Sequence, residues 1–597
     1  MRAVMNKILW AGLCMVLAGH ALAKDLIVTD DSGEGLATVM VTRVLAQKPK
    51  LILADEGYPA DGVSNQSAVE NTRFSDANGM LNFPDTGIAY DYRFRKPGFK
   101  DVSLRAAAVA AQLSLGEGLT VQMEREQDRR VLAEQKPSNV WLSQLDIGGG
   151  EALRQHFALN CAFCHQQASP FMRVERSAEE WLTVIDRMGG YGARIAGDLR
   201  QPLAEGLAAG YHSLNASYET VPEPRPWDSA LAGASYTEWP IGDGFSQMHD
   251  FILHPNGMVY VGDNLQDRIY EVNPKTGVYT VYTVPHEPED KLVGFLGNRF
   301  KAYGKINNYM GVHSFAVSPK DGHIFITPSM QRAWLEFDPQ TKTFTRHEMT
   351  RGFYPHTIRT DEQDRVWFTL ALSSQVAMWD RQKKVFSYFD IPARNIKEWL
   401  TIKLLPLIFW LDPETRPMPS VDRESSGLPM PYGIDVAPDG RVWFARLYAN
   451  DFGYIDPETG EVTVIDIEVI GPRRLRVDAE NRVWMVAFQA GLLVMYDPQT
   501  KILKEYDLPV VSEFPYALNV DRARSVVWVN GNQSDTVMRF DIATETWQVY
   551  PMPRRRTFTR DIEIAEDGSV YTSNSHFPSW QIEDAQPTLI HITPYPQ

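Results

Sequence analysis

PYGIDVAPDGRVWFARL, residues 431–447, decides the fold of most of this chain. It contains two strand-like runs, YGIDV and RVWFARL, joined by the turn-forming residues A-P-D-G. Similar pairs of runs begin at residues 249, 313, 356, 474, 516 and 560, and most continue through a turn such as DPETG into two further runs. Four short strands in each unit, recurring mostly every 41–44 residues, predict the blades of a β-propeller. Seven such units predict a closed seven-bladed ring.

The last unit has no outer strand of its own. It stops after LIHITPYPQ, whereas SYTEWPIG at 235–242 resembles the outer strands of the other units. We expect this early strand to complete the blade formed by the end of the chain, so that residues 236–597 form one propeller domain.

Two steps between units are longer than the repeat. They predict insertions near 284–310 and 392–428. The second insertion contains IKEWLTIKLLPLIFWL, an apolar run that is too short to span a bilayer. Residues 397–410 could pack on the ring as a cap, or they could form an exposed surface that contacts a membrane or another protein.

A different signal stands before the propeller, in LNCAFCHQQ at 159–167. Cys161, Cys164 and His165 form a C-x-x-C-H motif, the attachment signature of a c-type haem. The two cysteines would form thioether bonds to one haem c, and His165 would bind the iron. A disulfide between the cysteines is the alternative for an exported protein.

The second axial ligand of the iron is less clearly marked. Met188 is our choice because it ends a predicted helix beside two glycines, where the chain can fold back over the haem, and a thioether ligand favours electron transfer. Met172 lies too close to the motif in the sequence for the chain to return over the haem. His156 and His212 are the alternatives.

The N-terminus predicts export. Residues 1–23 combine Arg2 and Lys7 with an apolar run and an A-L-A ending, which is typical of a signal peptide cleaved after Ala23. We therefore expect a periplasmic protein. Without this segment, 57 basic residues remain against 75 acidic ones, a formal charge of −18, which disfavours binding to nucleic acid.

The remaining segments complete a multidomain, mainly β chain. Residues 24–125 alternate as short strands around the turn D-A-N-G at 76–79 and predict a β-sandwich. Residues 126–149 read as a charged linker. Residues 150–220 predict a small all-α c-type cytochrome domain, in which Ser177 and Glu180 have the spacing of a capping box.

The repeat alignment also predicts a site in the propeller. Residues that open the inner strands surround the central channel at one end. His576, near the end of the last unit, should lie beside the first. Histidines with Tyr432 and Arg560 suit either a divalent metal or an anionic small-molecule substrate that needs acid–base help. The residues that share the opening position are His249, His313, His356, Tyr432, Arg473, Tyr516 and Arg560.

Three resemblances accompany these patterns. The repeats resemble the virginiamycin B (streptogramin) lyase family, which implies a His, a Glu fourteen residues later, a second His and a divalent metal that assists elimination. The first unit has His249 and Asp263 but Leu265 at the third position, and the last unit keeps only His576. The haem segment resembles the haem-binding part of the quinohaemoprotein amine dehydrogenase large subunit. Residues 24–125 resemble a carboxypeptidase-regulatory-like sandwich.

Three functions remain open from the sequence. The first is a periplasmic oxidoreductase that binds a small molecule at the channel mouth and passes electrons through the haem to a soluble acceptor or cytochrome. The second is a lyase or hydrolase of the streptogramin-lyase type with an appended haem domain. The third is a non-catalytic electron-transfer or partner-binding subunit. Because an elimination needs no redox centre, the haem motif favours the first over the second.

Overall fold

A computed structural model describes residues 26–50, 60–113, 118–193, 195–294, 303–410 and 428–595. The predicted signal peptide lies outside these residues. So do residues 295–302 and 411–427, which belong to the two predicted insertions.

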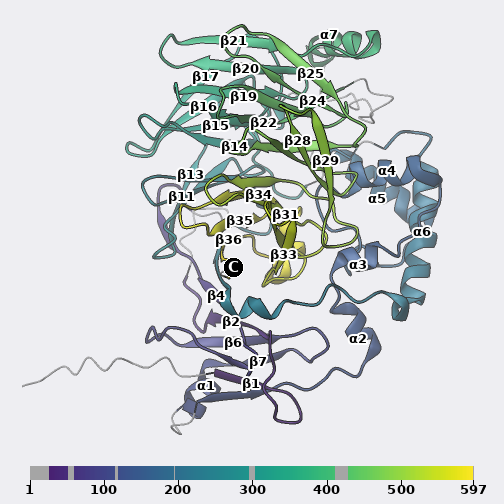
Figure 1. Cartoon of the computed structure of the whole chain (residues 1–597), viewed down its shortest axis with the longest axis vertical. Helices are drawn as coiled ribbons and strands as arrows, with labels where there is room; N and C mark the ends of the chain where they lie inside the picture. The colour runs from purple at the N-terminus through teal and green to yellow at the C-terminus, as the bar shows by residue number, and fades with distance from the viewer. Residues whose placement is uncertain are drawn as a thin grey trace, which may run out of the picture.

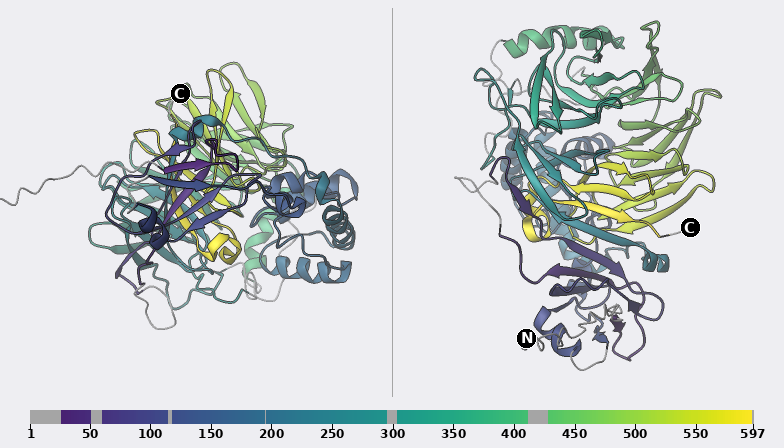
Figure 2. Two further views of the ribbon diagram at one scale, coloured as in Figure 1. Left: turned by 90° about the horizontal axis from the view of Figure 1, so that it is seen from below. Right: turned by 90° about the vertical axis from the view of Figure 1, so that its left-hand side faces the viewer.

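The propeller predicted from the repeats is present. Seven four-stranded antiparallel sheets follow one another, and the inner strand of each contacts that of the next until the seventh meets the first (Figures 1 and 2). The strands alternate in burial and pack against the neighbouring blades through apolar clusters. From the inner to the outer strand, the blades are β10 (Met248–Leu253), β11 (Val259–Asp263), β12 (Arg268–Val272) and β13 (Val278–Thr283); β14 (Val312–Val317), β15 (Ile324–Pro328), β16 (Ala333–Asp338) and β17 (Thr343–Glu348); β18 (Pro355–Thr360), β19 (Arg365–Leu370), β20 (Gln375–Asp380) and β21 (Val385–Asp390); β22 (Pro431–Val436), β23 (Val442–Arg446), β24 (Asp451–Ile455) and β25 (Val462–Asp466); β26 (Pro472–Val477), β27 (Val483–Ala487), β28 (Leu492–Asp497) and β29 (Ile502–Asp507); β30 (Leu518–Asp521), β31 (Val526–Asn530), β32 (Thr536–Asp541) and β33 (Thr546–Pro551); and β34 (Thr559–Ile564), β35 (Val570–Asn574), β36 (Thr588–Thr593) and β9 (Ser235–Pro240).

The early strand closes the ring as expected. β9 pairs antiparallel with β36, with Trp239 opposite Leu589 and Tyr236 opposite Ile592. The start and the end of the propeller are therefore hydrogen-bonded within one blade.

Most inner strands carry a β-bulge at the channel mouth. The pairing of β10 with β11 shifts between Met248 and Phe251, and equivalent shifts occur in five other blades. A bulge inserts one extra residue and changes the direction of nearby side chains. Two consecutive residues from each of these strands can thereby face the channel.

The N-terminal strands form a sandwich around their own apolar core. One layer has the order β5-β1-β8, and the other has the order β4-β2-β6-β7. The elements are β1 (Leu26–Thr29), β2 (Met40–Leu45), β3 (Ser64–Gln66), β4 (Glu70–Phe74), β5 (Met80–Leu81), β6 (Tyr90–Arg95), β7 (Val102–Leu104), α1 (Ala106–Leu113) and β8 (Leu119–Gln122).

The sandwich is continuous with the propeller and is not a separate spacer. β4 pairs antiparallel with β9, so that one eight-stranded sheet runs from blade seven into the sandwich. β3 extends blade one by pairing with β13. Buried Arg554 fastens the junction, with its guanidinium 2.7 Å from Glu70 and 3.1 Å from Glu238.

The helices lie beside one face of the propeller (Figures 1 and 2). The stretch expected as a linker instead forms two short helices, and Trp141 is buried in the core that they share with the longer ones. The capping box forms, because Ser177 Oγ accepts from Glu180 N and Glu180 Oε2 accepts from Ser177 N. The helices are α2 (Arg129–Glu134), α3 (Ser138–Leu142), α4 (Gly150–Cys161), α5 (Ala178–Gly190) and α6 (Arg200–Ala216).

The apolar insertion forms helix α7 (Ile396–Trp410), which is only partly packed. Glu398 and Leu405 are buried, and Glu398 pairs with Arg394 and Arg446. An apolar outer face remains exposed and consists of Ile396, Trp399, Leu400, Leu404 and Leu407. None of the helices in the described part of the chain has the length and apolar character needed to cross a membrane.

Candidate functional site

The C-x-x-C-H motif lies where α4 ends and faces a cavity of about 470 Å³. Cys161 and Cys164 are free thiols and both line this cavity together with His165. Burial raises the pKa of Cys161 to about 12, and it lowers the pKa of His165, so that the thiol stays protonated and the imidazole stays neutral. Two unbridged thiols beside a neutral imidazole and an apolar cavity form a donor set that fits a c-type haem.

The hydrogen bonds of His165 select one ring nitrogen for a metal. Nδ1 lies 3.3 Å from the Gln166 carbonyl oxygen and 3.2 Å from Gln167 Nε2. A partner at Nδ1 fixes the ring orientation and leaves Nε2 for coordination. His165 is therefore suited to bind iron through Nε2.

Two methionines line the same cavity, and neither alternative histidine does. Met188, in the last turn of α5, is among the lining residues, and so is Met172, which the sequence argument set aside as too close to the motif. His156 Nε2 instead accepts from Ala196 N at 3.2 Å. The side chain of His212 is 72% exposed and pairs with Glu175. Of these four residues, only the two methionines line the cavity and could contact a group held there.

The motif is bound tightly to blades six and seven. Gln166 Nε2 donates to Asp535 Oδ1 at 2.7 Å and to the Thr557 carbonyl oxygen at 2.8 Å. Phe577 N donates to the Cys164 carbonyl oxygen at 2.9 Å. The helical segment and the propeller therefore build this cavity together.

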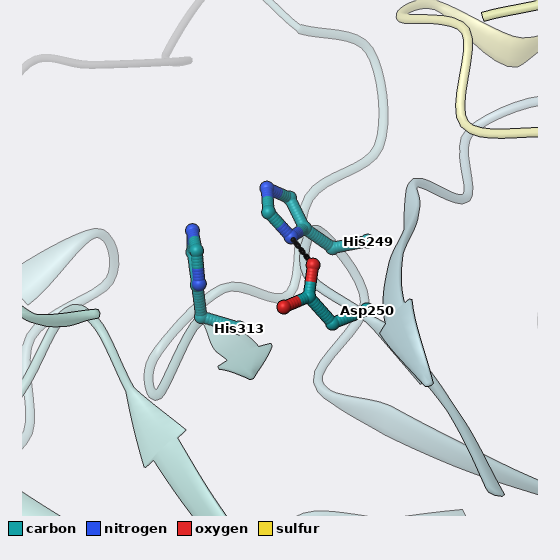
Figure 3. A group of neighbouring side chains, drawn as sticks. All are labelled: His249, Asp250 and His313. Carbon is teal, nitrogen blue, oxygen red and sulfur yellow. Dashed lines mark hydrogen bonds and ion pairs between the residues drawn. The ribbon is translucent and has the colours of Figure 1, made fainter. Parts of the chain in front are cut away.

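The channel mouth assembles three of the predicted histidines. The ring centroids of His249 and His313 are 3.9 Å apart, and those of His313 and His356 are also 3.9 Å apart. Figure 3 shows the rings of His249 and His313 side by side and pointing the same way. Burial lowers the pKa of His249 to about 4 and lowers those of His313 and His356 well below the usual value. All three imidazoles are therefore neutral near pH 7.

A layer of charges that the sequence analysis missed lies against these rings. His249 Nδ1 is 2.9 Å from Asp250 Oδ1, and the ligand atoms of His249, Asp250 and His313 lie within 4.8 Å of one another (Figure 3). Asp250 also accepts from Arg474 Nη2 at 2.6 and 2.9 Å, and Arg474 Nη1 donates to Asp561. Asp250, Arg474 and Asp561 each directly follow a residue of the predicted ring. A β-bulge at this position of the inner strand turns the following side chain toward the channel as well.

Tyrosines and arginines complete the mouth. Tyr432 and Tyr516 share a hydrogen bond of 2.9 Å between their hydroxyl oxygens, and Arg473 Nη2 donates to the Tyr432 oxygen at 2.6 Å. Tyr516 also lies 3.4 Å from His249 Nε2. Arg560 Nη2 donates to the carbonyl oxygen of Phe163, which lies between the two cysteines.

A second cavity of about 140 Å³ fills the centre of the mouth. Its wall includes His249, His313, Tyr432, Tyr516 and Arg560. Several residues of its wall also line the larger cavity of the motif, so that the two cavities adjoin. The shared residues are Asn160, Cys164, Tyr191, Ala193 and Phe577.

Two other expected residues have different surroundings. His576 does not join the three histidines, because its ring faces His165 with centroids 6.0 Å apart, and its Nε2 is 3.5 Å from Gln166 N. Asp263 is held within its own blade by Gln247 N and Leu265 N. The carboxylate beside His249 is therefore Asp250.

Comparisons with known proteins give distant matches to the fold. Virginiamycin B lyase from Staphylococcus aureus is 13% identical and matches 60% of this chain and 99% of its own, with a TM-score of 0.45. A streptogramin B lyase is 14% identical over 60% of this chain and 98% of its own, also with a TM-score of 0.45. Hydrazine synthase of Kuenenia stuttgartiensis is 13% identical over 46% of this chain and 80% of its own, with a TM-score of 0.35. No family model and no curated protein matches the sequence.

Proposed function

We propose that this protein is an exported c-type haem oxidoreductase. Cys161 and Cys164 would attach the haem, His165 would bind its iron, and Met188 or Met172 would supply a further sulfur ligand. The channel mouth would bind the small-molecule reactant, and a haem in the adjoining cavity would supply the redox chemistry that links it to a soluble acceptor or cytochrome. The haem supplies one-electron redox chemistry when it is bound.

The common wall of the two cavities carries this proposal. Cys164, Tyr191 and Phe577 line both the motif cavity and the mouth cavity. Because electron transfer weakens steeply with distance, a molecule in the mouth would be well placed to exchange electrons with a haem in the larger cavity. A separate cytochrome domain attached only for docking would not need to share this wall.

The outer edge of the larger cavity suits contact with an electron acceptor. Phe171 and Trp580 line the cavity, are 40% and 46% exposed, and pack with ring centroids 5.3 Å apart. The same edge favours a second candidate, an electron-transfer subunit without its own substrate. In that case the mouth would hold no reactant, and a partner enzyme would deliver the electrons.

Purification of the exported protein with its haem tests the proposal. The pyridine haemochrome spectrum of the denatured protein should show covalently bound haem c, and the native protein should titrate as a reversible one-electron couple. Cys161→Ala combined with Cys164→Ala should lose the covalent haem. His212→Ala, an exposed position outside the cavity, should keep it. Non-covalent haem, or none in the wild-type protein, would reject the proposal.

A further inference from the structure

Two arginines of the channel mouth are buried and have no acidic partner among the residues that the structure describes. Arg473 is 0% exposed and Arg560 is 3% exposed. Among the described residues, neither forms an ion pair with a carboxylate. Nη2 of Arg473 donates to the Tyr432 hydroxyl oxygen, and Nη2 of Arg560 donates to the Phe163 carbonyl oxygen. Within the described part of the chain, Nε and Nη1 of Arg473 and Nε of Arg560 have no hydrogen-bond partner. Buried charges without a partner are costly and call for an explanation.

Arg474 shows that the fold can neutralise an arginine at this depth. It neighbours Arg473 on β26 and is equally buried, yet it pairs with Asp250 and Asp561 at 2.6 and 2.8 Å. Both nearby carboxylates are thereby used by one guanidinium. Three buried guanidiniums face two carboxylates, so the mouth keeps a positive charge even with both acids ionised.

Aromatic rings compensate the two unpaired charges only in part. The Arg473 guanidinium carbon lies 3.3 Å from the ring centroid of Tyr516 and 4.0 Å from that of Phe163. Arg560 lies 4.8 Å from the centroid of Tyr516. Such contacts stabilise a cation but leave its N–H groups without acceptors.

The hydroxyl groups direct further donors into the cavity. Because Arg473 can only donate, the Tyr432 oxygen accepts, and its hydrogen is left for Tyr516 or for the cavity. Burial raises the pKa of Tyr516, but the guanidiniums of Arg473 and Arg560 outweigh it and lower that pKa overall. This shift reports the positive field at the point where the two tyrosines meet.

This charge favours an anion over a metal ion in the mouth. His249, Asp250 and His313 have the spacing of metal ligands, but Asp250 is bound in two hydrogen bonds to Arg474. A divalent cation would also be repelled by Arg473 and Arg560. A carboxylate would instead offer acceptors to the guanidinium and the hydroxyl groups.

We propose that the channel mouth binds a small monocarboxylate, with its carboxylate held by Arg560 and Tyr516 and with Arg473 positioning the tyrosines. The volume of about 140 Å³ admits only a few non-hydrogen atoms, which selects short carboxylates over larger acids. The inference names the ligand class of the site in the proposed function and depends on that function for its redox role.

The carboxylate proposal is tested by calorimetry, in which the haem-loaded protein is titrated with sodium acetate, sodium formate or uncharged acetamide. Ionic strength is held constant with a bulky sulfonate salt that the cavity cannot admit. We expect one acetate or formate per chain and at least tenfold weaker binding of acetamide. Arg560→Gln should weaken acetate binding at least tenfold, whereas Arg560→Lys should retain most of it. Arg476→Gln is the matched control, because Arg476 on β26 is buried like Arg560 but lines the opposite end of the channel.

The proposal fails if the wild-type protein binds no short carboxylate, if acetamide binds equally well, or if folded Arg560→Gln binds acetate like the wild type. It also fails if acetate binds to the haem-free double variant Cys161→Ala, Cys164→Ala but not to the haem-loaded protein. That result would mean that a carboxylate of the haem itself occupies the mouth. The wild-type comparison of acetate with acetamide needs no variant and stands even if Arg560→Gln does not fold. Haem content is measured separately, so that carboxylate binding without covalent haem would reject only the proposed function.

Discussion

The rings of His165 and His576 face each other with centroids 6.0 Å apart and an angle of 24° between their planes. His165 belongs to the C-x-x-C-H motif, whereas His576 follows strand β35 in blade seven. The proposed iron ligand is thus packed from one side by the propeller. His165, Met172 and Met188 line the same cavity, so either methionine could supply a second ligand to an iron that His165 binds.

Replacing each methionine in turn should identify that ligand. We expect Met188→Ala to remove the weak absorption band near the red end that marks sulfur–iron coordination, and to lower the reduction potential, because thioether ligation raises it. Met172→Ala should keep the band. Spectroscopy and potentiometry of the two oxidised proteins provide the measurement. Loss of the band in Met172→Ala alone would transfer the role to Met172.

The buried histidines of the mouth should make the protein sensitive to acid. The pKa of His313 is well below 6.5 in the folded protein because of burial and its neighbours His249 and His356, whereas the unfolded chain binds the proton near 6.5. Protons therefore favour the unfolded state, and the free energy of unfolding should fall as the pH drops below about 6.5, by up to about 1.4 kcal/mol per pH unit for each histidine.

Denaturant unfolding between pH 7 and pH 4.5 measures this effect. His313→Gln should have a smaller pH slope than the wild type over this range, because one proton fewer is taken up on unfolding. His212→Gln, at an exposed position, is the control. An unchanged slope in folded His313→Gln would contradict the neutral, buried state of this side chain.

The sequence predicted the propeller because its signal repeats. The alternation around 431–447 recurs in every blade, and the same alignment brought His249, His313 and His356 together at the mouth. The early strand at 235–242 was found for the same reason, since it matches outer strands elsewhere in the ring.

The features that the sequence did not predict depend on partners far apart in the chain. Asp250 directly follows His249, and Arg474 directly follows Arg473. Consecutive residues of a strand normally point to opposite faces, and the bulges in β10 and β26 bring both residues to the channel. His576 was assigned to the mouth because the alignment contains no information on the motif that packs against it. Trp141 lies in a charged, Gly-ended stretch that reads as a linker, and its burial requires the helices that surround it.

The junction between the sandwich and blade seven should depend on Arg554. Its guanidinium is buried between Glu70 and Glu238, and burial raises the pKa of Glu238 to about 7 even with this partner present. Arg554→Gln would leave two buried carboxyl groups without their cation, which we expect to cost roughly 3–5 kcal/mol.

Urea unfolding at pH 7 tests this loss. Arg555→Gln is the neighbouring control, because its side chain is 41% exposed and exposed ion pairs contribute little. The defect of Arg554→Gln should shrink as the pH falls below about 7, since Glu238 then becomes protonated and neutral. A defect that is independent of pH would show that packing, and not charge, dominates at this position.

The last prediction concerns helix α7, where adjacent leucines have opposite surroundings. Leu404 is 48% exposed on the apolar outer face, whereas Leu405 is 1% exposed and packs with Leu265 and Leu428 in one apolar cluster. Leu405→Ser should therefore lower the free energy of unfolding by roughly 3 kcal/mol, because it removes buried apolar contacts and buries a hydroxyl. Leu404→Ser should change it by less than about 0.5 kcal/mol. If the outer face binds a protein or a membrane surface, Leu404→Ser and Trp399→Ser should also reduce self-association in sedimentation and binding to phospholipid vesicles. Equal destabilisation by Leu404→Ser and Leu405→Ser would instead show that both faces of α7 are packed in solution.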